Sequence, residues 1–417
     1  MDFFSSIPPA LWIAALLAFY MAWAIGANDV ANAMGTSVGS GALTLGGAII
    51  VAAVFEFAGA FLAGGHVTDT VRKGMLDMAL LSREQLIFGM LASLASAGTL
   101  LIGATRFGLP ISTTHSIVGA IVGFGAVAVG IDAVKWAKVT QIALSWITSP
   151  LLAGVIAFLI FHLIRSAILN KERPVNQIRK YGPAFFFFVF FIIGLVTLFK
   201  GLKHINLDLD LVQALIGSFV LGLIGAGIGA FFIRRVEIGA TDPNHRFDQV
   251  EKIFIVLQIL TACAIAFAHG SNDVANAIGP LAAIVNAVEN VDLTAKAPIA
   301  PWMLVIGGLG IVIGLATWGY RVMETVGKRI TELTPSRGFA AQLAAASTIV
   351  LASRLGIPIS TTHTLVGAVL GVGLARGITA LDLRVVGKIL ASWIATLPIA
   401  AALSVFFYFF FKGLLTA

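Results

Sequence analysis

One stretch of ten residues occurs twice in this chain of 417 residues. Residues 26–35 read Gly-Ala-Asn-Asp-Val-Ala-Asn-Ala-Met-Gly, and residues 270–279 read Gly-Ser-Asn-Asp-Val-Ala-Asn-Ala-Ile-Gly. A second pair follows at nearly the same spacing, Gly108-Leu-Pro-Ile-Ser-Thr-Thr-His115 and Gly356-Ile-Pro-Ile-Ser-Thr-Thr-His363. Because the order and the spacing are both kept, the sequence predicts an internal duplication whose two copies meet at one site.

The composition around these motifs is that of a membrane protein. Only 11% of the residues are charged, 59% are hydrophobic and the mean hydropathy is +0.98, whereas soluble domains have about 25% charged residues. Apolar runs of about 18–25 residues recur along the chain, and each can cross a hydrocarbon core ~30 Å thick. We therefore expect an all-α polytopic membrane protein with about 10–12 transmembrane segments, some of them broken or re-entrant.

Several function classes are disfavoured by the composition. We attribute the net charge of +7 to the orientation of the chain in the membrane, because Lys and Arg collect in cytoplasmic loops. No basic tract is interleaved with aromatic residues, so we expect no nucleic-acid partner. Cys263 is the only cysteine, which excludes an intrachain disulfide. The sequence shows no catalytic triad, Walker loop or Cys/His metal cluster, so we expect no enzyme and no covalent cofactor.

The duplication divides the chain into two homologous halves joined by a central segment. We assign residues 1–165 to the first half and 253–417 to the second, with further spans and loops in residues 166–252. The dipeptide Ser145-Trp146 recurs as Ser392-Trp393, so the repeat extends beyond the two motifs. An odd number of crossings between the copies would give the halves opposite orientations, as is common in secondary transporters, and we expect such an inverted repeat.

Proline residues mark expected helix breaks near both motifs. Pro110 and Pro358 interrupt apolar runs, and we expect a helix to begin again at Ser112 and at Ser360. Gly279-Pro280 follows the second Asn-Asp motif, where we expect the helix that carries this motif to end.

The Asn-Asp motifs place hard oxygen ligands inside the membrane. A carboxylate at the centre of a bilayer costs ~2.5–3.5 kcal/mol on insertion scales, so each aspartate is expected to face a partner or a cavity. Carboxylate and amide oxygens suit a hard cation, although polar contacts between packed helices are an alternative. The candidate ligands of such a cation are Asp29, Asn32, Asp273 and Asn276, with Asn28 and Asn272 beside them in the motifs.

The Pro-Ile-Ser-Thr-Thr segments combine the features of an anion site. Proline followed by hydroxyl residues favours the first turn of a helix. The free N–H groups and the dipole of a helix N-terminus attract anions, and hydroxyls add donors without a fixed charge. Two such starts can hold a tetrahedral oxyanion from two sides, although an ordinary capped helix is the alternative reading. The anion-binding candidates are Ser112, Thr113, Thr114, Ser360, Thr361 and Thr362.

Three further residues are candidates for coupling or gating. Glu56 lies alone in an apolar run, and an ionisable residue within the membrane is a functional candidate by default. His115 and His363 end the two Ser/Thr motifs, where a histidine can serve as a proton carrier or as a hydrogen-bonded structural residue.

These motifs resemble the signature of the inorganic phosphate transporter (PiT) family. The resemblance rests on the two Asn-Asp motifs and the two Gly-x-Pro-Ile-Ser-Thr-Thr-His motifs in order, and it runs over nearly the whole chain. It implies a cation-coupled symporter for inorganic phosphate with inverted halves and a homodimeric assembly. It also implies that phosphate binds the Ser/Thr residues named above together with Asn28 and Asn272. The coupling cation, assigned below to Na⁺, would bind Asp29, Asn32, Asp273 and Asn276, and Glu56 matches an acidic position that the family uses. This chain departs from the animal members at Gln342, where they tend to have an acidic residue, and it lacks their long hydrophilic central loop.

The resulting hypothesis is a multi-pass protein of the cell membrane that imports phosphate with Na⁺ through alternating access. Oxygen-bearing side chains in two matched sets favour Na⁺ over a proton relay, which needs only one carboxylate. Proton-coupled or metal-phosphate symport within the same family is the first alternative. An anion channel is the alternative from another class, and it would show no strict coupling.

Overall fold

The computed structural model describes residues 9–64, 75–198, 209–235, 246–289, 299–354 and 359–416 of the chain, without the side chains of residues 31, 32, 246, 353, 354 and 416. Within these ranges the regular structure is helical apart from an isolated antiparallel bridge between Leu76 and Val134. The predicted turn at Gly356-Ile-Pro358 lies outside the described residues. The fold is therefore of the all-α class that the composition predicts.

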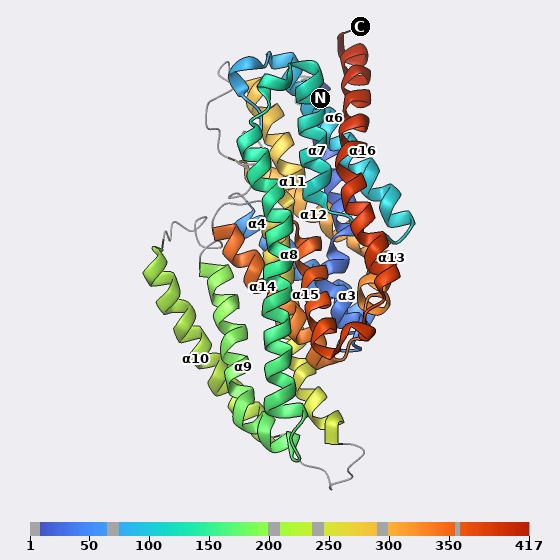
Figure 1. Ribbon diagram of the computed structural model, residues 1–417. Coiled ribbons are helices and arrows are strands. Elements are labelled where there is room, and N and C mark those ends of the chain that lie inside the picture. Colours follow the sequence, from blue (N-terminus) through green and yellow to red (C-terminus); the bar gives the residue numbers. More distant parts are fainter. Residues whose placement is uncertain are drawn as a thin grey trace.

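The helices gather in one bundle (Figure 1). Those of the first half are α2 (Pro9–Asn28), α3 (Val30–Gly39), α4 (Leu45–Ala63), α6 (Arg83–Arg106), α7 (Thr113–Ala128) and α8 (Trp136–Ile164). The centre contributes α9 (Pro174–Val196) and α10 (Leu211–Arg235), which pack on each other at one side of the bundle. The second half contributes α11 (Arg246–Glu289), α12 (Pro301–Trp318), α13 (Tyr320–Glu324), the π-helix η6 (Thr325–Arg329), α14 (Pro335–Arg354), α15 (Thr361–Arg376) and α16 (Leu383–Thr416).

The described helices confirm a multi-pass membrane protein. Nine of them are long and apolar enough to cross a bilayer, and α7 is a shorter apolar helix beside them. Local sequence explains several of their starts. Ser82 and Gln85 form a capping box at α6, and the Thr44 hydroxyl accepts the Gly47 amide at α4. Pro174 begins α9, where its missing N–H has no helical partner to lose.

The expected helix end at Gly279-Pro280 is wrong. Helix α11 contains Pro280 in its interior and runs on to Glu289. A proline there removes one backbone hydrogen bond and costs ~3 kcal/mol or more in an isolated helix. From Asn272 to Ala287 the side chains of α11 are buried against neighbouring helices. This packing on all sides holds the helix together across the proline.

The two halves of the sequence are interlaced through close glycine contacts. A Cβ added at Gly26 of α2 would lie 1.9 Å from the carbonyl oxygen of Ile311 in α12, so the two helices touch backbone to backbone. The matching position in the second half, Gly270 of α11, lies in the same way against the carbonyl of Glu56 in α4. Each motif helix therefore packs on a helix of the opposite half. Helices α7 and α16, and α15 and α8, repeat this arrangement through Gly119 and Gly367.

Candidate functional site

The predicted helix starts at the Ser/Thr motifs are confirmed. Helix α7 begins after Ser112, whose hydroxyl accepts the amide of His115 at 3.1 Å. Helix α15 begins after Ser360, whose hydroxyl accepts the amide of His363 at 3.1 Å. Both serines are thus N-caps, and the threonines after them stand in the first helical turn.

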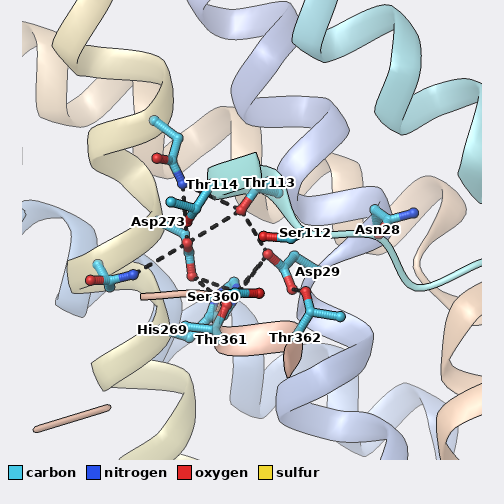
Figure 2. Close-up of polar contacts among 12 residues, drawn as sticks. Asn28, Asp29, Ser112, Thr113, Thr114, His269, Asp273, Ser360, Thr361 and Thr362 are labelled. Carbon is cyan, nitrogen blue, oxygen red and sulfur yellow. Dashed lines mark hydrogen bonds and ion pairs between the residues drawn. The ribbon is translucent and has the colours of Figure 1, made fainter. Parts of the chain in front are cut away.

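The two helix starts meet the two aspartates at one buried site, as Figure 2 shows. The Thr113 hydroxyl lies 2.8 Å from Asp29 Oδ2 and 3.3 Å from Asp273 Oδ1. The Thr361 hydroxyl lies 2.9 Å from Asp273 Oδ2 and 3.4 Å from Asp29 Oδ2. The Thr362 hydroxyl donates to Asp29 Oδ1 at 2.6 Å. Each aspartate therefore contacts helix starts from both halves, as the sequence predicts for copies that meet at one site.

The backbone around the two aspartates differs between the copies. Asp29 stands at a turn position between α2 and α3, whereas Asp273 lies within the continuous helix α11. Both carboxylates are fully buried. An interruption of a helix at membrane depth is tolerated where the backbone is enclosed by protein, and such interruptions are common at transporter sites.

His269 is a site residue that the sequence analysis missed. Its Nδ1 lies 2.8 Å from Glu56 Oε2, and its Nε2 lies 3.1 Å from Asp273 Oδ2 and 3.7 Å from Asp29 Oδ2. All four side chains are buried, and an imidazolium is the form that can donate from both ring nitrogens. With ionised carboxylates and a protonated imidazole this group carries two net negative charges. The sequence signal that could have pointed to His269 was Glu56, because a lone acid buried in an apolar run requires a partner.

The Glu56–His269 pair has no polar counterpart in the matching position of the other half. Gly26 matches Gly270, and each packs on a backbone carbonyl, that of Ile311 and that of Glu56. The residues that correspond to His269 and Glu56 are therefore Ile25 and Ile311, and both are fully buried. The two matching helix crossings are packed alike, but only one of them carries an ionisable pair, Glu56 and His269.

The four predicted asparagines have different surroundings. Asn28 donates to Thr105 Oγ1 at 2.9 Å and to the Leu109 carbonyl at 3.1 Å, and it accepts the Ile111 amide at 3.2 Å. These contacts are with the end of α6 and with the turn before α7, and Figure 2 shows Asn28 to one side of the carboxylates. Asn272 is 3.4 Å from Asp273 Oδ1 and from the Ile359 carbonyl, and Asn276 donates to Asp273 Oδ1 at 3.1 Å. The side chain of Asn32 lies outside the described part of the chain.

Three other residues of interest lie near the site but not at the carboxylates. His115 and His363 are buried one residue beyond Thr114 and Thr362 and contact each other. Gln342 of α14 donates to the Ala33 carbonyl at 2.9 Å and to Ser37 Oγ at 2.8 Å, so its amide binds polar groups of α3.

The site can hold cations through side chains that are already gathered. Ligand atoms of Asp29, His269 and Asp273 lie within 4.8 Å of one another, and the carboxylate oxygens are the ligands that remain when His269 is protonated. The hydroxyls of Thr113 and Thr361 add oxygen atoms between the two carboxylates. Oxygen-rich surroundings of this kind suit hard cations. A helical membrane protein that buries such a duplicated, charged site where helices are interrupted belongs to the class of membrane transporters.

Comparisons with known proteins identify the particular family. A sequence profile of the phosphate transporter family matches residues 25–404, and the chain belongs to this family. A Haemophilus influenzae protein named as a candidate phosphate permease is 47% identical, over 96% of both chains. "Inorganic phosphate transporter 2-1, chloroplastic" of Arabidopsis thaliana is 44% identical, over 96% of this chain and 72% of its own length. The solved structure of a sodium-dependent phosphate transporter superimposes with a TM-score of 0.89 at 40% identity, covering 97% of this chain and 99% of that one.

These findings confirm the family expected from the motifs and the all-α membrane fold. The family and the named relatives are transporters or permeases and not enzymes. The chain is a multi-pass membrane protein, and the cell membrane is the usual location of such permeases.

Proposed function

We propose that this chain imports inorganic phosphate by symport with Na⁺ through alternating access. The observation that carries the proposal is the bridging of Asp29 and Asp273 by threonine hydroxyls from both helix starts. The structural neighbour is a sodium-dependent phosphate transporter, which supports Na⁺ as the coupling ion. Proton coupling within the same family remains the second candidate because Glu56 and His269 form a buried acid–imidazole pair.

The hydrogen bonds suggest an order of binding. A threonine hydroxyl has one proton, so Thr113, Thr361 and Thr362 cannot donate to an aspartate and to phosphate at once. Na⁺ bound to the oxygens of Asp29 and Asp273 would replace those donors. The hydroxyls, with the free amides of the two helix starts, would then be available to phosphate oxygens. In this mechanism Na⁺ binds first and prepares the phosphate site, which links the two substrates.

Charge balance also requires that cations bind together with phosphate. The four central side chains carry two net negative charges when the carboxylates are ionised and His269 is protonated. Phosphate brings further negative charge into a buried site, where unpaired charge is costly. At least two cations per phosphate are therefore needed, and Asp29 and Asp273 supply one carboxylate to each. The remaining candidate ligands are Asn32 and Asn276 for Na⁺, and Asn272, Ser112, Thr114 and Ser360 for phosphate.

Asn28 is proposed to act on the phosphate site through the turn that it binds. Its three hydrogen bonds hold residues 105–111 against the junction of α2 and α3. The helix start at Ser112 thereby keeps its place relative to Asp29.

Alternating access is proposed to move groups of helices that combine both halves. Helix α2 is in backbone contact with α12, and α11 with α4, so these contacts join the first half to the second. The inverted relation of the halves and the homodimer are further proposals that follow from the family resemblance. Cross-linking of the protein in its native membrane tests the homodimer, and an uncross-linked monomer under all conditions contradicts it.

The test is uptake of labelled phosphate into proteoliposomes with an inward Na⁺ gradient or, separately, an inward proton gradient. We expect accumulation above equilibrium with Na⁺ alone and its loss in Asp29→Asn and Asp273→Asn. Asp132→Asn is the matched control because this aspartate is exposed in the short 3-10 helix η2 (Ile131–Ala133) that follows α7. Accumulation with the proton gradient only would replace Na⁺ by H⁺. Uptake that never exceeds equilibrium would mean a channel.

A further inference from the structure

His115 and His363 form the centre of a cluster of four buried rings. Their ring centroids lie 4.4 Å apart in an edge-to-face arrangement. His115 packs on Trp146 at 3.7 Å, and His363 stacks on Trp393 at 3.5 Å. Both histidines and both tryptophans are buried. The cluster thus joins the first turns of α7 and α15 to the middle of α8 and α16.

The hydrogen bonds of this cluster cross between the halves of the chain. Nδ1 of His115 lies 3.4 Å from the carbonyl oxygen of Trp393, and Nδ1 of His363 lies 3.2 Å from the carbonyl oxygen of Trp146. Each histidine therefore stacks on the tryptophan of its own half and contacts the tryptophan carbonyl of the opposite half. A carbonyl accepts and cannot donate, so both Nδ1 atoms carry the proton.

The opposite side of each ring does not continue into a proton path. In the described part of the chain, Nε2 of His115 and Nε2 of His363 are buried and have no hydrogen-bond partner. A residue that relays protons needs a partner on both sides of the ring. The neighbouring groove is lined by apolar residues of α8, α15 and α16, including Ile147, Leu151 and Leu390. A charged imidazole there would be buried among groups that cannot compensate it.

Further bonds tie the two helix starts to each other. The Thr114 hydroxyl donates to the Ile359 carbonyl at 3.2 Å. The matching Thr362 hydroxyl lies 3.4 Å from the Ile111 carbonyl, but its one proton is donated to Asp29 at 2.6 Å. Nε1 of Trp393 donates to the Pro110 carbonyl at 3.2 Å. The turn of one half is therefore held by the helix of the other. The separation of the two starts depends on these crossed contacts.

We propose that His115 and His363 are positioning residues that set the separation of the two phosphate-binding helix starts and carry no proton in the transport cycle. Each acts by donating from Nδ1 to the tryptophan carbonyl of the opposite half. The inference rests on the proposed phosphate transport. The two histidines are therefore structural residues and not proton carriers, and their hydrogen bonds affect the affinity for phosphate.

The test compares substitutions that keep or remove the Nδ1 donor. The side-chain amide of asparagine places its nitrogen near the position of Nδ1, whereas leucine has similar bulk without a donor. We expect His115→Leu and His363→Leu each to raise the KM for phosphate by about 3- to 10-fold, the effect of one lost buried hydrogen bond. His115→Asn and His363→Asn are expected to stay within about 2-fold of the wild type, with Vmax changed less than KM in every variant.

The control is His162→Leu, because His162 lies on α8 with an exposed ring stacked on Phe158, outside the cluster. Size-exclusion chromatography and thermal unfolding in detergent report whether each variant folds. If a leucine variant does not fold, glutamine replaces it, since its amide reaches the position of Nε2 instead of Nδ1. The glutamine variant is expected to raise KM as leucine does.

Three outcomes overturn the proposal. Equal loss of transport in the asparagine and leucine variants would show that the imidazole itself is required, as for a proton carrier. An unchanged KM in the leucine or glutamine variants would show that the crossed contacts do not set phosphate affinity, while wild-type uptake still supports the transport function. Absence of phosphate accumulation in the wild type would remove both proposals together.

Discussion

Replacing Glu56 and His269 by isoleucine, singly and together, tests whether this buried pair is an asymmetric addition to a symmetric framework. The matching positions hold Ile25 and Ile311, so the fold already accommodates two isoleucines at an equivalent helix crossing. The double variant Glu56→Ile/His269→Ile copies that arrangement. The two single variants each leave one polar partner in place.

The magnitudes follow from the contacts of each side chain. His269→Ile leaves the fully buried Glu56 without the partner at 2.8 Å, and removing one member of a buried pair costs ~3–5 kcal/mol. Glu56→Ile costs less, about 1.5–3 kcal/mol, because His269 keeps Asp273 at 3.1 Å. In the double variant the pair is gone, and the contacts of His269 with Asp273 at 3.1 Å and with Asp29 at 3.7 Å are lost, which again costs about 1.5–3 kcal/mol. The sum of the single effects therefore exceeds the double effect by about 3–5 kcal/mol, the coupling energy.

The assay is denaturant unfolding of purified protein in detergent, followed by a spectroscopic probe of helix content. Glu289→Gln is the control because it changes an exposed acid at the end of the same helix, α11, and is expected to shift stability by less than about 0.5 kcal/mol. Additive single effects, with a double variant as unstable as their sum, would refute the reasoning. That result would mean that Glu56 and His269 do not stabilise one another.

Three further predictions concern packing, capping and a buried amide. Gly59→Val should lower the thermal unfolding temperature strongly, because an added Cβ would lie 2.1 Å from a backbone carbonyl of α11. In the control Gly103→Ala the added Cβ meets nothing within 4 Å, so this variant should be neutral or more stable. Equal unfolding temperatures for the two variants would contradict the close contact at Gly59. Ser112→Ala should lower the free energy of unfolding by about 0.5–2 kcal/mol, because it removes the N-cap of α7, and it should raise the KM for phosphate. An unchanged KM would show that this N-cap does not contribute to phosphate binding. Gln342→Glu should lower the free energy of unfolding by about 1–3 kcal/mol, because a carboxylate would face the Ala33 carbonyl in place of an amide donor; unchanged stability would show that the acid is accommodated.

The sequence alone predicted the parts of the site that depend on local chemistry. Ser112 and Ser360 were expected to begin helices because hydroxyl residues after a proline satisfy the first free amides, and both are N-caps. The two motif copies were expected to meet at one site because their order and spacing are kept, and each aspartate was expected to face a partner or a cavity because a carboxylate in a bilayer is costly. Asp29 and Asp273 share Thr113 and Thr361 there. The membrane class followed from the hydropathy of long apolar runs, which is also a local property.

Only the tertiary structure decided the contacts between distant segments. Glu56 and His269 are separated by 213 residues, and no periodicity in either segment relates them. Helix α11 passes Pro280 because its neighbours bury it on all sides, a circumstance absent from its own sequence. The amide of Asn28 serves the turn before α7, although its motif is nearly identical to that of Asn272. Sequence determines what each short segment can bind, but the crossing of helices from opposite halves determines which of those groups meet, because burial and pairing depend on the whole assembly.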